Sequence, residues 1–126
     1  FTNSSSIDAD TTGYTTGNEV SGTNYTAGGN TLASITIGLA DNSSSVPTAF
    51  VDCADTTWSS STISNARGAL IYNSTLSTAG TGSTTNHAAN PSVAVINFGG
   101  DKSSSAGDFT IQMPANDANR ALIRIA

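Results

Sequence analysis

Two apolar stretches separated by a polar one, within residues 93–113, constrain the fold of this chain more than any other feature. Residues 93–98 are almost all apolar, so an extended segment here needs cover on both faces. Residues 109–113 alternate apolar and polar side chains, which favours a strand with one buried face. Residues 99–108 between them are mostly Gly, Ser, Asp and Lys, which end regular structure. The pattern predicts two antiparallel strands joined by a polar loop, the first strand being central in its sheet.

The same signals recur along the rest of the chain. They predict four further strands that contribute to the core, at residues 31–39, 46–53, 66–72 and 121–125. Pro47 lacks an N–H and therefore marks either the start of its strand or a sheet edge. The cleanest alternation predicts a half-buried strand with one apolar face, made of Ala33, Ile35, Ile37 and Leu39.

No stretch has the periodicity of a helix, and turn-forming residues recur between the apolar segments. We therefore expect an all-β fold: an antiparallel β-sandwich of Greek-key or jelly-roll type, with six to seven strands and long polar loops. The 126 residues suffice for one domain with its own core. Residues 1–18 are interpreted as an N-terminal arm or loop, residues 19–126 as a single domain, and residues 76–91 as a long surface loop.

The scarcity of cations excludes two classes of partner. The chain has four Lys plus Arg and a formal net charge of −5, so it lacks the clustered cations that bind phosphate. It has no basic amphipathic segment for an anionic membrane surface, and no apolar run approaches the roughly 20 residues that span a bilayer. We expect it to bind neither nucleic acid nor membrane.

The side chains capable of chemistry do not form a catalytic pattern. Asp52 and Asp55 allow a metal or acid-pair interpretation, but turn carboxylates are favoured because no further ligands follow at set spacing. His87 lies in the polar loop without a second ligand or a nucleophile at catalytic spacing. Cys53, the single cysteine, lies in an apolar run and is interpreted as a small core residue. The sequence predicts no catalytic, cofactor-binding or metal-binding residue, and a protein that is not an enzyme.

Two bulkier residues have specific expectations. Trp58, the only tryptophan, is expected to close one end of the core, with a platform for a ligand as the alternative. Arg67 lies within an apolar run and needs a carboxylate partner if it is buried, although a solvated position on an open face is equally compatible. The candidate partners are Asp52, Asp55 and Asp101.

Three segments resemble a group of small proteins encoded in the structural-gene regions of tailed bacteriophages. They are NEVSGTNYTAGGNTLASITIGL at residues 18–39, VDCADTTWSSSTISNARGALIYN at residues 51–73 and INFGGDKSSSAGDFTIQMP at residues 96–114. The shared features are Glu-Val-Ser-Gly followed by Gly-Gly, an acidic stretch ending in Trp, Ala-Arg-Gly-Ala before a Tyr, and the block from Phe-Gly to Thr-Ile-Gln. The resemblance implies a place in the phage particle rather than a mechanism.

Within a particle, an acidic surface poor in cations suits the capsid exterior and not a surface facing DNA. The expected function is that of a non-enzymatic capsid decoration (cement) protein, which bridges major capsid subunits and associates with copies of itself, as a trimer. The alternative is a tail, baseplate or fibre component, or a carbohydrate- or receptor-binding module. In that alternative the aromatic residues in contact with sugar would be Tyr14, Tyr25 and Trp58.

Overall fold

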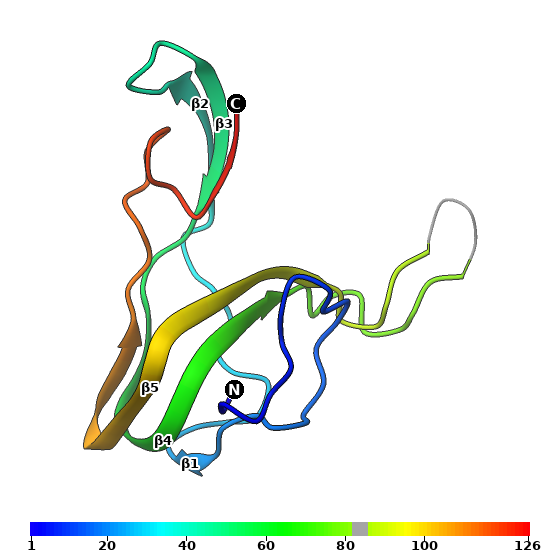
Figure 1. Ribbon diagram of the computed structural model, residues 1–126, viewed down its shortest axis with the longest axis vertical. Coiled ribbons are helices and arrows are strands. Elements are labelled where there is room, and N and C mark those ends of the chain that lie inside the picture. The colour runs from blue at the N-terminus through cyan, green and yellow to red at the C-terminus, as the bar shows by residue number, and fades with distance from the viewer. Residues whose placement is uncertain (82–85) are drawn as a thin grey trace. The chain divides into compact units, whose positions relative to one another are not determined.

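The computed structural model describes residues 1–81 and 86–126, and contains strands, turns and irregular segments but no helix in those residues. Its strands, in chain order, are β1 (Gly22–Thr23), β2 (Thr36–Asp41), β3 (Pro47–Asp52), β4 (Thr56–Tyr72), β5 (Ser92–Ile111) and β6 (Ile123–Ile125) (Figure 1).

The strands form two three-stranded sheets, with the orders β1-β4-β5 and β2-β3-β6. The pairs β1–β4, β2–β3 and β3–β6 are antiparallel. The all-β, antiparallel fold class predicted from the sequence, with its two sheets and six strands, is therefore confirmed. The segment predicted at residues 46–53 corresponds closely to β3, and Pro47 marks the start of that strand and not an edge, because β3 is central in its sheet.

The largest difference from the sequence prediction concerns β5. Residues 93–98 and 109–113 were expected to be two strands joined by a loop, but β5 runs without interruption through residues 99–108. The predicted loop is wrong, and so is the central position of the first segment, because β5 lies at the edge of its sheet and β4 is central. β4 likewise joins the predicted strand at residues 66–72 to the ten residues before it.

Serine hydroxyls explain why residues 99–108, although polar, stay in the sheet as part of β5. Positive φ angles at Asn65, within β4, and at Ala106, within β5, mark interruptions of the regular backbone, as at β-bulges. Here side chains replace backbone partners: the Ser103 hydroxyl accepts from the N–H of Asn65 at 3.0 Å, and the Ser104 hydroxyl accepts from the N–H of Ile63 at 3.2 Å. The polar residues that normally favour turns therefore serve the pairing of β4 with β5.

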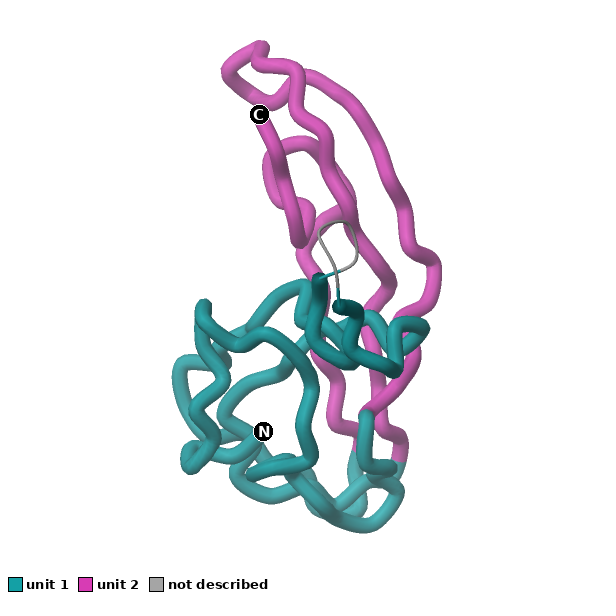
Figure 2. The backbone as a smooth tube through the Cα atoms, turned by 90° about the vertical axis from the view of Figure 1, so that its right-hand side faces the viewer, with its two compact units in different colours: residues 1–28, 60–107 teal, residues 29–59, 108–126 magenta. Residues whose placement is uncertain are grey.

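The described chain divides into two compact units, each made of two segments (Figure 2). Unit 1 contains residues 1–28 and 60–107, and unit 2 contains residues 29–59 and 108–126. The prediction of one domain at residues 19–126 stays a prediction. The buried apolar side chains of unit 1 are Val20, Ile63 and Ala66, and those of unit 2 are Ala118 and Ala121.

Residues 1–18 are irregular, as expected, but they pair with their own chain. Thr2 forms a β-bridge with Ala66, and the Phe1 carbonyl accepts from the N–H of Arg67 at 2.7 Å. Gly13 forms a second bridge, with Pro91 just before β5. This segment is therefore part of the packing of unit 1. In the loop predicted at residues 76–91, residues 82–85 lie outside the described part of the chain.

Candidate functional site

The sheet of unit 2 has one face made almost entirely of apolar side chains. Residues directly opposite in antiparallel strands share a face, so the register defines its members. Ile37 lies opposite Val51 and Leu39 lies opposite Ala49 across β2 and β3. On the other side of β3, Val51 is paired with Ile123 and Ala49 with Ile125. We call this the apolar face, and define it as Ile37, Leu39, Ala49, Val51, Ile123 and Ile125.

The apolar face is open to solvent. Ile37 is 80% exposed, Leu39 75% and Ile125 72%, and Ile35, just before β2, is 64% exposed. The alternation predicted at residues 31–39 is present from Thr36 onward, but the expectation of a half-buried strand, with its apolar face covered, is wrong. The alternation fixed which side chains share a face, but could not tell whether a second layer covers it.

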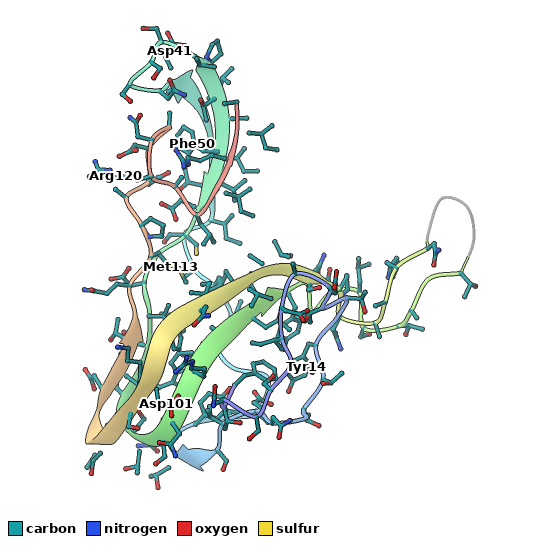
Figure 3. The ribbon with its side chains drawn as sticks, in the orientation of Figure 1. Tyr14, Asp41, Phe50, Asp101, Met113 and Arg120 are labelled. Carbon is teal, nitrogen blue, oxygen red and sulfur yellow. The ribbon has the colours of Figure 1, made fainter. Side chains whose placement is uncertain are left out.

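The opposite face of the same sheet is covered. Thr48 and Asp52 on β3 are each 1% exposed, and they share their face with Phe50. The connection to β6 buries Ala118 and Ala121, and the Asn119 side chain accepts from the N–H of Ser43 in the β2–β3 turn at 2.7 Å. Figure 3 shows Phe50 and Arg120, which belongs to this connection, on the same side of the β2–β3 hairpin. Unit 2 therefore supplies its own second layer on one face of the sheet only.

Gly38 explains how Phe50 is accommodated on the covered face. A Cβ atom at Gly38 would lie 2.4 Å from the Phe50 ring, which packs directly over its cross-strand partner. A glycine beneath an aromatic ring is a recurring cross-strand arrangement in sheets. It lets the largest side chain of β3 lie flat on the covered side of the sheet.

The side chains of the apolar face differ in size from strand to strand. β3, at its centre, carries the smaller side chains Ala49 and Val51, and the two flanking strands carry isoleucine and leucine. Larger side chains therefore border a central strip of smaller ones. Side chains of a second sheet can pack into this strip. Asp41, at the end of β2, is the one ionisable residue that the register adds to this side of the sheet.

Unit 1 contains a carboxylate surrounded by tyrosines, which we call the Glu19 cluster. The Tyr14 hydroxyl donates to one Glu19 oxygen at 2.7 Å, and the Tyr25 hydroxyl donates to the other at 2.7 Å. The N–H of Gly28 donates to that second oxygen at 2.8 Å. The Tyr72 ring stacks on Tyr14 with ring centroids 4.6 Å apart, and its hydroxyl donates to the Gly28 carbonyl at 3.0 Å. Figure 3 labels Tyr14 in this region.

The electrostatics of the Glu19 cluster favour protonated tyrosines. Burial, followed by the hydrogen bond to Glu19 and its negative charge, raises the pKa of Tyr14 to about 12. The same causes, in the same order, raise the pKa of Tyr25. A phenol with a raised pKa is a hydrogen-bond donor and a poor base or nucleophile at neutral pH. The cluster therefore joins the segments of unit 1 and is not arranged for proton transfer.

Alkaline pH is expected to destabilise the protein through these tyrosines. Unfolded tyrosine ionises near pH 10, whereas Tyr14 and Tyr25 keep their protons to higher pH in the folded state. The unfolded state then binds fewer protons, so stability is complete below about pH 10 and falls as pH rises through about 12. Urea unfolding at a series of pH values measures this loss. The double variant Tyr14→Phe and Tyr25→Phe should show a weaker dependence, and an equal dependence would contradict the assignment.

The carboxylates singled out in the sequence hold backbone groups. Asp52 ends β3, and one of its oxygens accepts from the N–H of Cys53 at 2.9 Å. An Asp55 oxygen accepts from the N–H of Met113 at 2.8 Å. The Asp52 bond is local, as expected of a turn carboxylate, whereas the Asp55 bond joins two segments 58 residues apart in the sequence. In residues 1–81 and 86–126, no three or more His, Cys, Asp or Glu side chains are grouped so that they could hold a metal ion.

Among the described residues, neither Cys53 nor His87 belongs to a group of side chains that could hold a metal ion. Burial, and then the negative charges of Asp52 and Asp55, raise the pKa of the Cys53 thiol, which is the opposite of what activates a thiol. His87 contacts the carbonyl of its neighbour Ala88 through Nδ1 at 2.9 Å.

Trp58 and Arg67 both lie at partly exposed positions. Trp58 is half-buried and packs edge-on against Phe109 with centroids 6.2 Å apart, so it is not fully enclosed in a core. Arg67 pairs with Asp101, one of its three candidate partners, at 3.6 Å between Nη1 and Oδ1. Both side chains of that pair are more than a third exposed, so the pair contributes little to stability.

A polar hollow of about 410 Å³ in unit 1 is lined by residues of the N-terminal segment, with Leu70. It contains the carboxylates of Asp8 and Asp10, both exposed, among several hydroxyl side chains. Asp8 accepts from the N–H of Asp10 at 2.9 Å, which accounts for its position as part of a turn. The apolar face thus stands out as the candidate functional site, an interaction surface.

The described residues contain no helix long and apolar enough to cross a membrane. Comparison with protein-family models, with curated proteins and with solved structures found no match.

Proposed function

We propose that this protein is a non-enzymatic structural protein of a tailed-bacteriophage particle. In its most specific form the proposal is a decoration protein on the capsid exterior, which bridges major capsid subunits. The resemblance of residues 18–39, 51–73 and 96–114 to proteins encoded among phage structural genes motivates the particle. The apolar face supports an action by contact, since exposed apolar patches mark surfaces that bind other macromolecules.

The charge of the chain supports the exterior location. With a net charge of −5 and four cationic residues, the surface repels nucleic acid and does not attract it. Two of those cations are already engaged with carboxylates, Arg67 with Asp101 and Arg120 with Asp117. A protein on the outside of a DNA-filled shell needs no cationic surface.

The side chains that carry chemistry support a structural role. The phenols of Tyr14 and Tyr25 and the thiol of Cys53 all have pKa values shifted upward, away from the reactive form. Glu19, Asp52 and Asp55 accept hydrogen bonds from backbone N–H groups. These groups stabilise turns and segments. The stabilisation of a shell by such a protein would follow mass action, because a module that binds only the assembled shell favours it.

The number of copies in the particle tests the proposal. Quantitative mass spectrometry of purified particles of the phage that encodes the chain should find hundreds of copies, as for a protein that covers the capsid. A handful of copies per particle would overturn the capsid assignment in favour of the tail, baseplate or fibre alternative. Absence from washed particles would overturn a virion role altogether. A gentle wash in low and high salt provides the control for adventitious adsorption.

A further inference from the structure

The open apolar face of unit 2, taken together with Ile35 just before β2, has the size of an interface. Ile37, Leu39, Ile125 and the neighbouring Ile35 together expose roughly 500 Å² of apolar surface, near the upper end for the largest patch on an ordinary monomer. Two such faces, with Ala49, Val51 and Ile123 between and beside these residues, would remove on the order of 1,200 Å² from water when packed together. That area is at the lower bound of what specific, stable interfaces bury.

In the part of the chain that the structure describes, the β2-β3-β6 sheet is covered on one side only, and no second layer packs on its apolar face. Antiparallel sheets are stable when each apolar face packs on another layer, and the connection to β6 covers only the face that carries Thr48, Phe50 and Asp52. We propose that the missing layer is the same face of a second copy of this chain, so that two β2-β3-β6 sheets form an intermolecular sandwich. The inference rests on the proposed function for its setting in a particle and deepens it by naming the self-contact.

The chemistry of the face favours a copy over an unlike partner. A face that is apolar across all three strands needs an apolar partner of the same extent, and a second copy provides one with identical strand lengths. A two-fold arrangement also makes the two faces complementary in shape. The larger side chains of β2 and β6 in one copy can lie along the strip of Ala49 and Val51 in the other. Asp41, at the end of β2, would lie at the rim of the contact and keep its hydration.

Charge provides a signature for this kind of contact. Each copy carries a net charge of −5, so two copies repel one another over distances that salt screens. Association through the apolar face should therefore strengthen as salt is raised. A contact of the acidic chain with a cationic partner would weaken under the same change.

The test is sedimentation velocity of the full chain at micromolar concentrations. The wild-type protein should sediment at about twice the 12.6 kDa mass of one chain, as a dimer and not as the trimer expected from the sequence. The double variant Ile37→Thr and Leu39→Thr keeps strand-forming residues at two exposed positions, so the fold of the protomer is retained. It should weaken association about 100-fold and return the mass to that of one chain.

Val93→Thr is the matched control, because it also removes exposed apolar surface from a strand, at a residue 54% exposed in the other sheet. Its association should equal that of the wild type. A monomeric wild type, or an oligomer that the double variant leaves intact, would overturn the inference. A monomer that is nonetheless present in hundreds of copies per particle would overturn this inference and leave the proposed function standing. A chain that associates in solution but is absent from particles would overturn the proposed function and leave this inference standing.

Discussion

Replacing Glu19 with alanine is expected to lower the free energy of unfolding by about 3 kcal/mol. Each hydrogen bond to a charged acceptor contributes about 1.5–3 kcal/mol, and bonds that share one acceptor do not add up fully. The carboxylate accepts from Tyr14, Tyr25 and the N–H of Gly28, and so fixes the course of the chain between residues 14 and 28. Tyr72 of β4 then joins this segment by stacking on Tyr14 and donating to the Gly28 carbonyl. Without the Glu19 carboxylate, two phenols and one backbone N–H lose their acceptor together. Urea unfolding near neutral pH, monitored by far-ultraviolet circular dichroism, measures the change.

Asp10→Ala is the matched control for this variant, because it changes the net charge equally at an exposed carboxylate. It should alter stability by less than about 0.5 kcal/mol, as exposed substitutions usually do. The single variants Tyr14→Phe and Tyr25→Phe each remove one donor and should be intermediate. A loss at Glu19 no larger than that at Asp10 would show that the cluster does not hold unit 1 together.

Replacing Gly68 with alanine is expected to destabilise the protein by about 3 kcal/mol, at the upper end of the usual cost of overpacking a buried site. Gly68 is buried in β4, the central strand of its sheet, and its Cβ would lie 2.6 Å from the carbonyl oxygen of Ile96 in β5. Because the obstructing atom belongs to the backbone, a change of rotamer cannot relieve the contact. The two long strands would have to separate locally.

Gly100→Ala is the control, since it makes the same substitution in the same sheet. A Cβ at Gly100 would meet nothing within 4 Å, so alanine should be neutral or slightly stabilising through its effect on the unfolded chain. Thermal unfolding of the two variants beside the wild type measures the difference. Equal midpoints for Gly68→Ala and Gly100→Ala would contradict the close approach of β4 to β5.

Alternation along the sequence predicted the strands best where they are short. β3 and the alternating apolar positions of β2 follow directly from the period of two at residues 31–39 and 46–53. Those positions also define the candidate site, since Ile37 and Leu39 belong to the apolar face. The pattern shows which residues lie together on one face. The pattern does not show which face another layer covers. Residues 114–120, which carry no periodic signal, lie on the opposite face.

The long strands were misjudged because tertiary pairing outweighed local preference. Residues 99–108 have the composition of a loop, but Ser103 and Ser104 accept hydrogen bonds from the backbone of β4 and keep the segment in the sheet. The bonded residues of β4 lie 38 to 41 residues earlier in the sequence. A prediction from the local sequence around residues 99–108 therefore does not include the strand that keeps them in the sheet. The same reasoning applies to β4, which begins ten residues before the strand predicted at residues 66–72.

The Glu19 cluster was present in the sequence only as a motif. Glu-Val-Ser-Gly and the following Gly28-Gly29 stood out, yet the chemistry that joins them is the convergence of Tyr14, Tyr25 and Tyr72. A lone carboxylate among three tyrosines is a weak signal until the fold brings their hydroxyls together. For Arg67 the sequence offered three candidate carboxylates and a solvated position, and the structure pairs it with one of the three, Asp101, at a partly exposed site.

The claim that this protein acts by contact through the apolar face can be tested at atomic detail. In a mixture of ¹³C-labelled and unlabelled chain, an isotope-filtered nuclear Overhauser experiment reports only proximities between different copies. We expect cross-peaks that connect the methyl groups of Ile37, Leu39 and Ile125 in one copy with those of the apolar face in another. Intermolecular cross-peaks confined to other methyl groups, such as those of Val93, or none at all at concentrations where the chain associates, would contradict the account.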